Sequence, residues 1–522
     1  MMAASFSMPP TDTALVAPRD STDAERARQA WRVLSVTSLG MTLTFLNTST
    51  LNIALPVLTR HFGATATQAS WFVLSYLLVN TAFILVFGRM TDLLGRKRLY
   101  MAGLAVITLA SLASAFAPTA DALIGLRAVQ GIGGAAILAN TTALLVDAFP
   151  DRLLALGLSL NVTAASAANV LGPAVGGLLV TSLGWRAVFW FNVPVGVGGL
   201  WWAGRVLPNK VAIRRGTEGF DYAGGLLTVL ILALVVFVLS RGNELGWTGA
   251  TTVSLGTATV ALFVALIVVE RGSRHPLIDP MLFRNRARSM AYAATTMMSV
   301  AQSAVALLVS LFLQAIQGAS PLQAGLWITP LAGGIMVASP VAGKLATRIE
   351  PRKLSSAGFA VTAAGLLVLA IGSRPDSSRL FLSLSTAAIG LGCGIFQAPN
   401  TASLMADVPP HRRGIASGLR STLQSTGQVV STAMCLAIVT AAVSTSQRQA
   451  FYSGSVDRSP AHLDEFVDGF RTAFAVLFAL CLVGIAASLL RGSRAVRDAD
   501  AVPARGGADM ASTSVIAAVD SP

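Results

Sequence analysis

The stretch GRMTDLLGRKR (88–98) is a short polar segment between two long apolar runs. Its glycines permit a tight turn, Asp92 can cap the start of a helix, and its basic cluster holds a loop on the cytoplasmic side of a membrane. A related segment, GKLATRIEPRK (343–353), follows 255 residues later. The pair predicts a membrane protein whose chain contains the same architecture twice.

The composition supports a membrane protein. The chain is 54% hydrophobic and only 12% charged, whereas an average soluble domain is about 25% charged. Apolar runs of roughly 18–25 residues recur along almost the whole chain, and about 20 such residues cross ~30 Å of hydrocarbon as a helix. A single soluble core is excluded because these runs are too long and too many. We therefore expect an all-α polytopic membrane protein in a lipid bilayer.

Fourteen membrane-spanning helices are predicted, so both chain ends lie on the same side. Placing the N-terminus in the cytoplasm puts 28 of the 38 Lys and Arg residues on cytoplasmic segments, as the positive-inside rule requires. The formal net charge of +14 is thus an orientation signal, and no nucleic-acid partner is expected. The predicted spans are 33–58, 70–87, 99–117, 122–147, 155–180, 187–206, 221–240, 250–269, 289–316, 324–343, 355–373, 380–405, 414–442 and 469–490.

A second internal repeat agrees with the first. NTTALLVDAFPDR (140–152) and NTASLMADVPPHR (400–412) share six residues in thirteen at an offset of 260. The two repeats align the second span with the tenth and the fourth with the twelfth. Two six-helix halves with two inserted helices explain this best, as in secondary transporters whose site lies at the midplane between the halves. Chance similarity between membrane segments is the alternative.

This arrangement divides the chain into five predicted segments. Two cytoplasmic disordered tails flank two six-helix halves, and the inserted helices with their cytoplasmic loops lie between the halves. In order, the segments are 1–32 (tail), 33–206 (N-terminal half), 207–288 (inserted helices), 289–490 (C-terminal half) and 491–522 (tail).

The polar turn resembles the loop signature of the major facilitator superfamily, through Gly88, Asp92, Gly95, Arg96 and Lys97. The resemblance implies the major facilitator fold. It also implies that Asp92 and the neighbouring basic residues form a latch of charges and helix dipoles on the cytoplasmic side. A role in membrane topology alone is the alternative.

The stretch LIGLRAVQGIGGA (123–135) carries an arginine inside the fourth span. An intramembrane cation is costly and is a functional hypothesis by default. Arg127, Gln130 and Gly134 share a helix face by their spacing, so Arg127 points at packed helices or a cavity, unless it snorkels outward. The stretch resembles the arginine-bearing element of the superfamily's proton-linked members.

The stretch LGPAVGG (171–177) interrupts the fifth span with a proline. Pro173 predicts a kink, and Gly172, Gly176 and Gly177 let another helix approach closely. This kink motif resembles the Gly-Pro element of exporters and antiporters rather than importers. An ordinary packing kink is the alternative.

Two further stretches, at 184–196 and 270–285, narrow the resemblance, together with TFLNTSTLNIALP (44–56). They resemble the fourteen-helix drug:proton antiporter branch, the multidrug and antibiotic-resistance exporters, over residues 33–490. The resemblance implies a bacterial cytoplasmic-membrane protein with both termini cytoplasmic. Its partners would be a small molecule and protons, with alternating access between the halves.

In that branch the first span carries an acid where this chain has Asn47, five residues before Asn52. The two amides lie about 140° apart around a helix and cannot both line one stripe. We expect Asn52 to bond to a neighbouring helix. Asn47 is expected to line the substrate cavity with Gln130, Gln397 and Asn400. An amide can hold a substrate but cannot titrate.

No carboxylate is predicted at mid-span, and two hypotheses follow. The cavity would favour neutral or acidic aromatic compounds over lipophilic cations, because it lacks an anion to pair with them. Proton coupling or gating would run through Arg127 and the boundary residues Asp92, Asp121 and Asp147, or through protonation of the substrate.

Other functions remain open. A facilitator or importer of a small metabolite could use the same scaffold, although the kink motif argues against it. A non-transporting membrane sensor would normally carry a soluble signalling domain. No enzyme, cofactor or metal site is expected, because the four histidines have no metal-binding spacing and the chain lacks a Gly-Lys-Ser/Thr phosphate loop. We expect a monomer.

Overall fold

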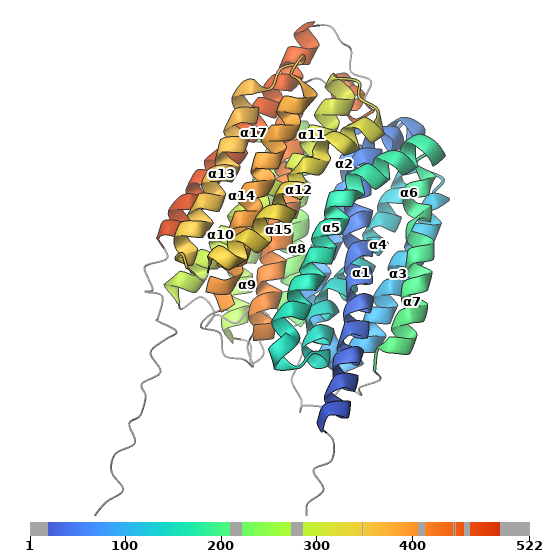
Figure 1. Cartoon of the computed structure of the whole chain (residues 1–522). Helices are drawn as coiled ribbons and strands as arrows, with labels where there is room; N and C mark the ends of the chain where they lie inside the picture. The colour runs from blue at the N-terminus through green and yellow to red at the C-terminus, as the bar shows by residue number, and fades with distance from the viewer. Residues whose placement is uncertain are drawn as a thin grey trace, which may run out of the picture.

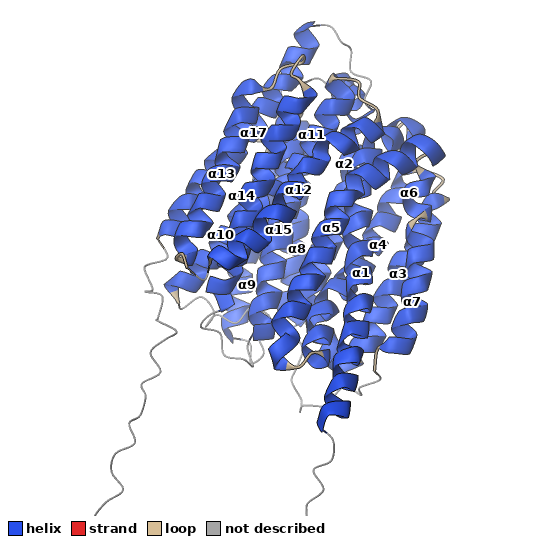
Figure 2. Ribbon diagram, viewed as in Figure 1, coloured by secondary structure: helices blue, strands red, loops and turns tan. Residues whose placement is uncertain are grey.

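The computed structural model describes residues 19–208, 222–272, 285–346, 348–405, 413–441, 443, 445–453 and 460–490. The regular elements in these ranges are all helical (Figure 2). In chain order they are α1 (Arg19–Phe62), α2 (Ala66–Leu94), α3 (Arg96–Ala115), α4 (Ala120–Ala148), α5 (Asp151–Leu183), α6 (Arg186–Trp190), α7 (Asn192–Val206), α8 (Tyr222–Leu245), α9 (Ala250–Gly272), α10 (Arg286–Ser303), α11 (Val305–Leu311), the π-helical turn η2 (Phe312–Ile316), α12 (Pro321–Leu345), α13 (Pro351–Gly372), α14 (Arg379–Met405), α15 (Arg413–Val439), α16 (Thr445–Ser453) and α17 (Pro460–Leu489).

Thirteen helical stretches in the described ranges are long and apolar enough to cross a membrane, judged by length and composition. They coincide with thirteen of the fourteen predicted spans. The remaining span, 187–206, is divided because α6 ends at Trp190 and α7 begins at Asn192. Pro194 accounts for the division, since a proline ring clashes with the carbonyl four residues earlier, which here belongs to Trp190.

The first helix begins earlier than the sequence predicted. Residues 19–32 belong to α1, so the predicted disordered tail at 1–32 is wrong for this part. The segment contains good helix formers such as Ala, Arg, Gln and Glu, and it packs against the fold: Ala30 is buried, and Gln29 donates to the carbonyl of Val206 at 2.7 Å. Residues 1–18 and 491–522 lie outside the described ranges, as do the loop segments 209–221 and 273–284.

The helices form two bundles side by side (Figure 1). In the N-terminal half, α4 packs against α2 and α3, and α1 packs against α5. In the C-terminal half, α14 packs against α12 and α13, and α13 packs against α17. The inserted helix α8 contacts both α2 and α15, and α9 packs on α8. The predicted all-α architecture, two six-helix halves with two inserted helices, is therefore confirmed.

We call the end of the molecule that carries the turn between α2 and α3 the basic face. It holds Arg96, Lys97 and Arg98 at the start of α3, together with Lys344 near the end of α12. Helix α1 also begins there, at the lower end of Figure 1. The other end is called the opposite face. The distribution of Lys and Arg in the sequence predicts that the basic face is cytoplasmic.

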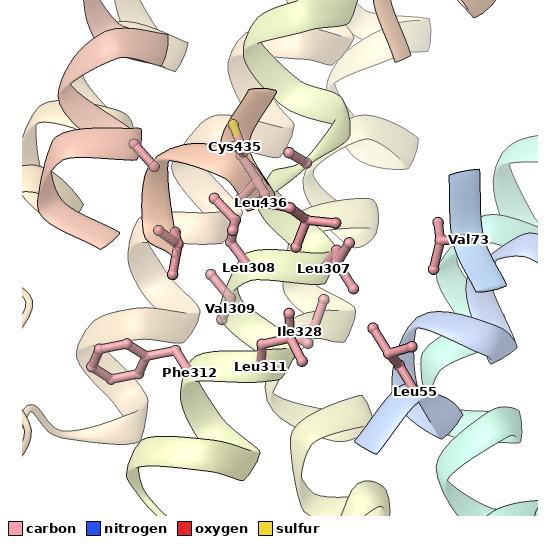
Figure 3. Close-up of a cluster of buried hydrophobic side chains, with 14 of the residues drawn as sticks. Leu55, Val73, Leu307, Leu308, Val309, Leu311, Phe312, Ile328, Cys435 and Leu436 are labelled. Carbon is pink, nitrogen blue, oxygen red and sulfur yellow. The ribbon is translucent and has the colours of Figure 1, made fainter. Parts of the chain in front are cut away.

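The apolar core joins the two halves near the opposite face only. The largest buried cluster combines Leu55 of α1 with Ile328 of α12 and Leu436 of α15 (Figure 3). The clusters toward the basic face each belong to one half, around Tyr100 in the N-terminal half and Tyr292 in the C-terminal half. The structure is therefore closed at the opposite face.

Helices α5 and α12 meet backbone to backbone beside this cluster. A side chain at Gly177 of α5 would bring its first carbon within 2.6 Å of the Leu322 Cα atom. A side chain at Gly325 of α12 would collide with the carbonyl of Pro173. We call this contact the α5–α12 seam (Pro173, Gly177, Leu322, Gly325).

The seam can be opened by a single side chain. We expect Gly325→Val to separate α5 from α12 and to admit reagents from the opposite face. A membrane-impermeant thiol reagent applied to intact cells should then label a cysteine introduced at the buried position Ile328 several-fold faster. The three native cysteines are all buried, which keeps the background labelling low: Cys393, Cys435 and Cys481.

The matched control is Gly333→Val on the same helix, because a side chain at Gly333 meets nothing within 4 Å. Its labelling should equal that of the parent protein. Equal rates in the two valine variants would show that the seam does not hold the opposite face closed.

Candidate functional site

Arg127 of α4 is fully buried within the N-terminal half. Its guanidinium donates to the side-chain oxygens of Asn47 at 3.1 Å and Gln130 at 2.6 Å, and to the carbonyl of Phe72 at 3.2 Å. It also lies 4.5 Å from the ring centre of Tyr76. Arg127 therefore points into packed helices, as one of its two predicted orientations required, and does not snorkel.

The amides extend this network to α3 and α7. Asn192 of α7 donates to the Asn47 Oδ1 atom at 3.2 Å. Gln130 donates to the hydroxyls of Ser111 at 3.0 Å and Ser114 at 3.4 Å on α3. The groups that bind the cation are all neutral. A carboxylate at position 47 would lie close enough to Arg127 to form an ion pair.

The two amides of α1 differ in their surroundings. Asn47 is completely buried in the Arg127 network and lines neither of the two cavities described below. Asn52 lies between the halves, and its Oδ1 atom has no hydrogen-bond partner. The expectation that Asn52 bonds to a neighbouring helix is therefore wrong for its side chain. A substrate contact at Asn47 stays a prediction.

A cavity of about 50 Å³ lies between the halves, and we call it the interhalf cavity. Its N-terminal wall is partly polar, and its C-terminal wall is apolar. This volume is far below the ~300–1,000 Å³ of pockets for drug-sized ligands, so the halves must separate to admit such a molecule. The lining residues are Ser49, Asn52, Ile53, Asn169 and Pro173 from the N-terminal half, and Ala306, Ile328, Leu331, Ala332 and Ile335 from the C-terminal half.

The kink motif forms part of this wall. Pro173 lines the cavity and has no N–H, so the carbonyl of Asn169 four residues earlier lacks its helical donor. A side chain at Gly172 would collide with the Ser49 hydroxyl, while one at Gly176 would approach the Cα atom of Thr50 to 2.8 Å. The motif therefore packs α5 against α1 on one side and against α12 through the seam on the other.

A second cavity, of about 10 Å³, lies within the C-terminal half, and we call it the Arg420 cavity. Arg420 donates to the Gln397 Oε1 atom at 3.4 Å, and Asn400 donates to the Thr295 hydroxyl at 2.8 Å. The predicted cavity residues Gln397 and Asn400 thus lie together in this half. The full lining is Thr295, Met298, Ser299, Gln302, Phe396, Gln397, Asn400, Arg420 and Gln424.

The predicted coupling carboxylates of α4 lie at its two ends. Asp121 is exposed and accepts a hydrogen bond from Gln68 at 2.8 Å. Asp147 forms an ion pair with Arg96 at the basic face. Neither residue lines the interhalf cavity or the second cavity. The side chain of Asp92 lies outside the described part of the structure, so a role of these residues in coupling stays a prediction.

The loop motif cross-links helices at the basic face. Gly95 has a φ angle of 87°, a backbone conformation that favours glycine. Arg96 connects the start of α3 to Asp147 near the end of α4. Lys97 donates to the carbonyls of Gly204 and Leu207 at 2.8 and 2.7 Å, where a cation complements the C-terminus of α7.

Several residues of these sites received no role from the sequence. Asn192, Ser111 and Ser114 complete the Arg127 network, and Arg420 lines a cavity. Their signal was a polar side chain inside an apolar span, which many packing residues share. Sequence spacing alone does not show which of them meet.

Residues 37–431 and 291–517 match the model of the Major Facilitator Superfamily. The chain belongs to this superfamily. The multidrug resistance protein Stp of Mycobacterium tuberculosis (strain CDC 1551 / Oshkosh) is 33% identical over 412 residues, covering 78% of this chain and 75% of Stp. The riboflavin transporter RibZ of Clostridioides difficile (strain 630) is 27% identical over 459 residues, covering 88% of this chain and 96% of RibZ.

A solved structure shows the same major facilitator fold. The bacterial homolog of the human lysosomal transporter Spinster, in an inward-facing and unoccupied conformation, matches with a TM-score of 0.60 at 15% identity. The match covers 89% of this chain and 97% of the homolog. The predicted family and its resemblance to resistance exporters are confirmed by these findings. This major facilitator protein is a multi-pass membrane transporter of small molecules.

The Arg127 network should make Asn47 more important for stability than Asn52. Hydrogen bonds to a charged group contribute about 1.5–3 kcal/mol, so Asn47→Leu should lower the free energy of unfolding by roughly that amount. Asn52→Leu on the same helix is the matched control, since its Oδ1 atom has no partner, and it should cost little. Thermal unfolding of the purified variants in detergent measures both effects.

Asn47→Asp should be at least as stable as the parent protein, because the new carboxylate would pair with Arg127. Equal destabilisation by the two leucine variants would contradict a special role for Asn47 in holding the cation.

Proposed function

We propose that this transporter exports neutral or acidic aromatic compounds of the antibiotic type, driven by the proton gradient. The observation that carries the proposal is the charge of the side chains that line the two cavities. Arg420 lines one of them, and among the described residues neither cavity is lined by a carboxylate. A lipophilic cation in a water-poor site needs a nearby anion to offset its desolvation, and these walls offer none.

The kink motif and the relatives support export rather than import. Gly172, Pro173 and Gly177 resemble the element found in exporters and antiporters, and they lie where α5 meets α1 and α12. The relative Stp is named a multidrug resistance protein. A transporter of a metabolite, as RibZ is for riboflavin, is the second candidate, favoured by the 96% coverage of RibZ.

Proton coupling would use carboxylates at the ends of the helices. Asp147 is one candidate because its carboxylate forms an ion pair with Arg96 of α3 at the basic face, beside the hydrogen bond from Arg96 to the Ala143 carbonyl of α4. Asp121 and Asp92 are the other candidates, and a substrate that carries its own proton is the alternative.

The remaining assignments are part of the same proposal. The transporter would act as a monomer in the bacterial cytoplasmic membrane, with the basic face and both termini in the cytoplasm. Residues 33–206 and 289–490 would move as the two halves around the site, while the helices of 207–288 flank them.

Drug accumulation in efflux-deficient cells tests the substrate class. Cells that express the protein should accumulate several-fold less of neutral and acidic aromatic antibiotics, but normal amounts of quaternary ammonium dyes. A protonophore should restore accumulation. Strong protection that is confined to the cationic dyes would refute the charge argument, and uptake above that of control cells would favour the importer.

The triple variant Asp92→Asn, Asp121→Asn, Asp147→Asn tests the coupling residues. In proteoliposomes with an imposed pH gradient, we expect gradient-driven export to fall at least tenfold while downhill exchange of substrate continues. The single variant Asp121→Asn shows how much of the loss comes from the opposite face, because Asp92 and Asp147 lie at the basic face. Unchanged gradient-driven export in the triple variant would exclude the carboxylates and leave substrate protonation.

A further inference from the structure

The two arginines inside the helical bundle differ in how well their charges are satisfied. Arg127 has three hydrogen-bond acceptors and an aromatic face around it, and only its Nη2 atom is without a partner. It lines neither of the two cavities. Among the described residues, Arg420 has one acceptor, Gln397, at the long distance of 3.4 Å. Its Nε atom is buried without a partner.

A guanidinium has five N–H donors in a planar fork. Leaving such a cation in a low-dielectric interior without an anion is expensive. Within the described ranges, no carboxylate forms an ion pair with Arg420 and none lines its cavity. Arg420 thus has the donors and the charge for an anion, and the described residues supply no anion to it.

The rest of the cavity suits an oxygen-rich group. Gln302 and Gln424 line it beside Arg420, and each carries a side-chain NH2 group with two donors. Arginine binds a carboxylate through two parallel hydrogen bonds, and glutamine amides can donate to the remaining lone pairs.

The Arg420 cavity and the interhalf cavity are lined by neighbouring positions of one membrane-spanning segment, formed by α10 and α11. Gln302 lines the first and Ala306 the second, and four residues correspond to about 6 Å of helix. The interhalf cavity offers the apolar side chains Ile328, Leu331 and Ile335 on its C-terminal wall. One amphipathic molecule can therefore reach both cavities when the halves separate.

We propose that Arg420, with Gln397 and Gln424, binds the carboxylate of an acidic aromatic substrate whose apolar body lies in the interhalf cavity. This inference rests on the proposed function and narrows its substrate class to organic acids. Arg127 is excluded from the role because it lines neither cavity and its Nε and Nη1 atoms already donate within the N-terminal half. The site is asymmetric: the C-terminal half supplies the charge and the apolar wall, and the N-terminal half supplies the amides of Asn52 and Asn169.

Equilibrium binding to the full-length protein in nanodiscs of uncharged lipid tests the site. The probes are pyrenebutyrate and its primary amide, which share the aromatic body and differ in charge, with empty nanodiscs subtracted. The parent protein should bind the acid at least tenfold more tightly than the amide. In Arg420→Gln the preference should disappear through loss of acid binding, with amide binding unchanged.

Arg420→Lys keeps the charge but loses the paired donors, so it should retain part of the preference. Gln428→Leu, on the same helix but outside the lining of the Arg420 cavity, is the matched control and should keep all of it. An unchanged acid-to-amide ratio in Arg420→Gln, an equal loss of both probes, or no binding of the acid to the parent protein would each overturn the inference.

The binding experiment and the export experiment can fail independently of each other. If cells export neutral antibiotics but the probes show no preference for the acid, the inference fails and the exporter stands. If the preference for the acid depends on Arg420 but no compound is exported, the binding site stands and the export function fails.

Discussion

A positive charge that cannot leave the hydrocarbon must be surrounded by acceptors, and Arg127 obtains them from its own helix and from two helices that are distant in sequence. Asn47, Gln130 and the Phe72 carbonyl come from α1, α4 and α2, and Asn192 supports Asn47 from α7. The N-terminal half is therefore assembled around one guanidinium. With α1 fixed in this way, its other side presents Ser49 and Asn52 to the interhalf cavity.

The sequence predicted the spans and the doubled architecture well because both leave a signal that does not depend on tertiary contacts. Apolar length marks a membrane helix whatever its neighbours are, and the two repeats align the halves without any contact being known. Two local features were missed: Pro194 divides one span, and the helix-forming segment 19–32 extends the first. Both features were visible in the sequence but were weaker than the hydropathy signal.

The candidate site was less predictable, because it depends on which face of each helix meets which neighbour. Helical spacing showed that Asn47 and Asn52 face different ways, yet it could not say which direction leads to the other half. The kink motif likewise predicted a close approach of some helix, while its partner Gly325 stands in an ordinary-looking apolar span. Arg420 is an arginine within an apolar span, but the shortage of acceptors around it depends on how α10, α14 and α15 pack together.

The large cluster that joins the halves at the opposite face has a consequence for the membrane as a barrier. Most of its contacts are apolar, from Leu55 and Ile328 to Leu436, and separating them exposes surface to water at about 25 cal/mol per Å². Two hydrogen bonds, from Ser310 and Gln314 to carbonyls of α1, lie beside them. Ion pairs between exposed charges weaken as salt rises, whereas contact between dry hydrocarbon surfaces does not. We therefore expect the apolar part of this closure, and the barrier that it forms between the halves, to be insensitive to the salt concentration.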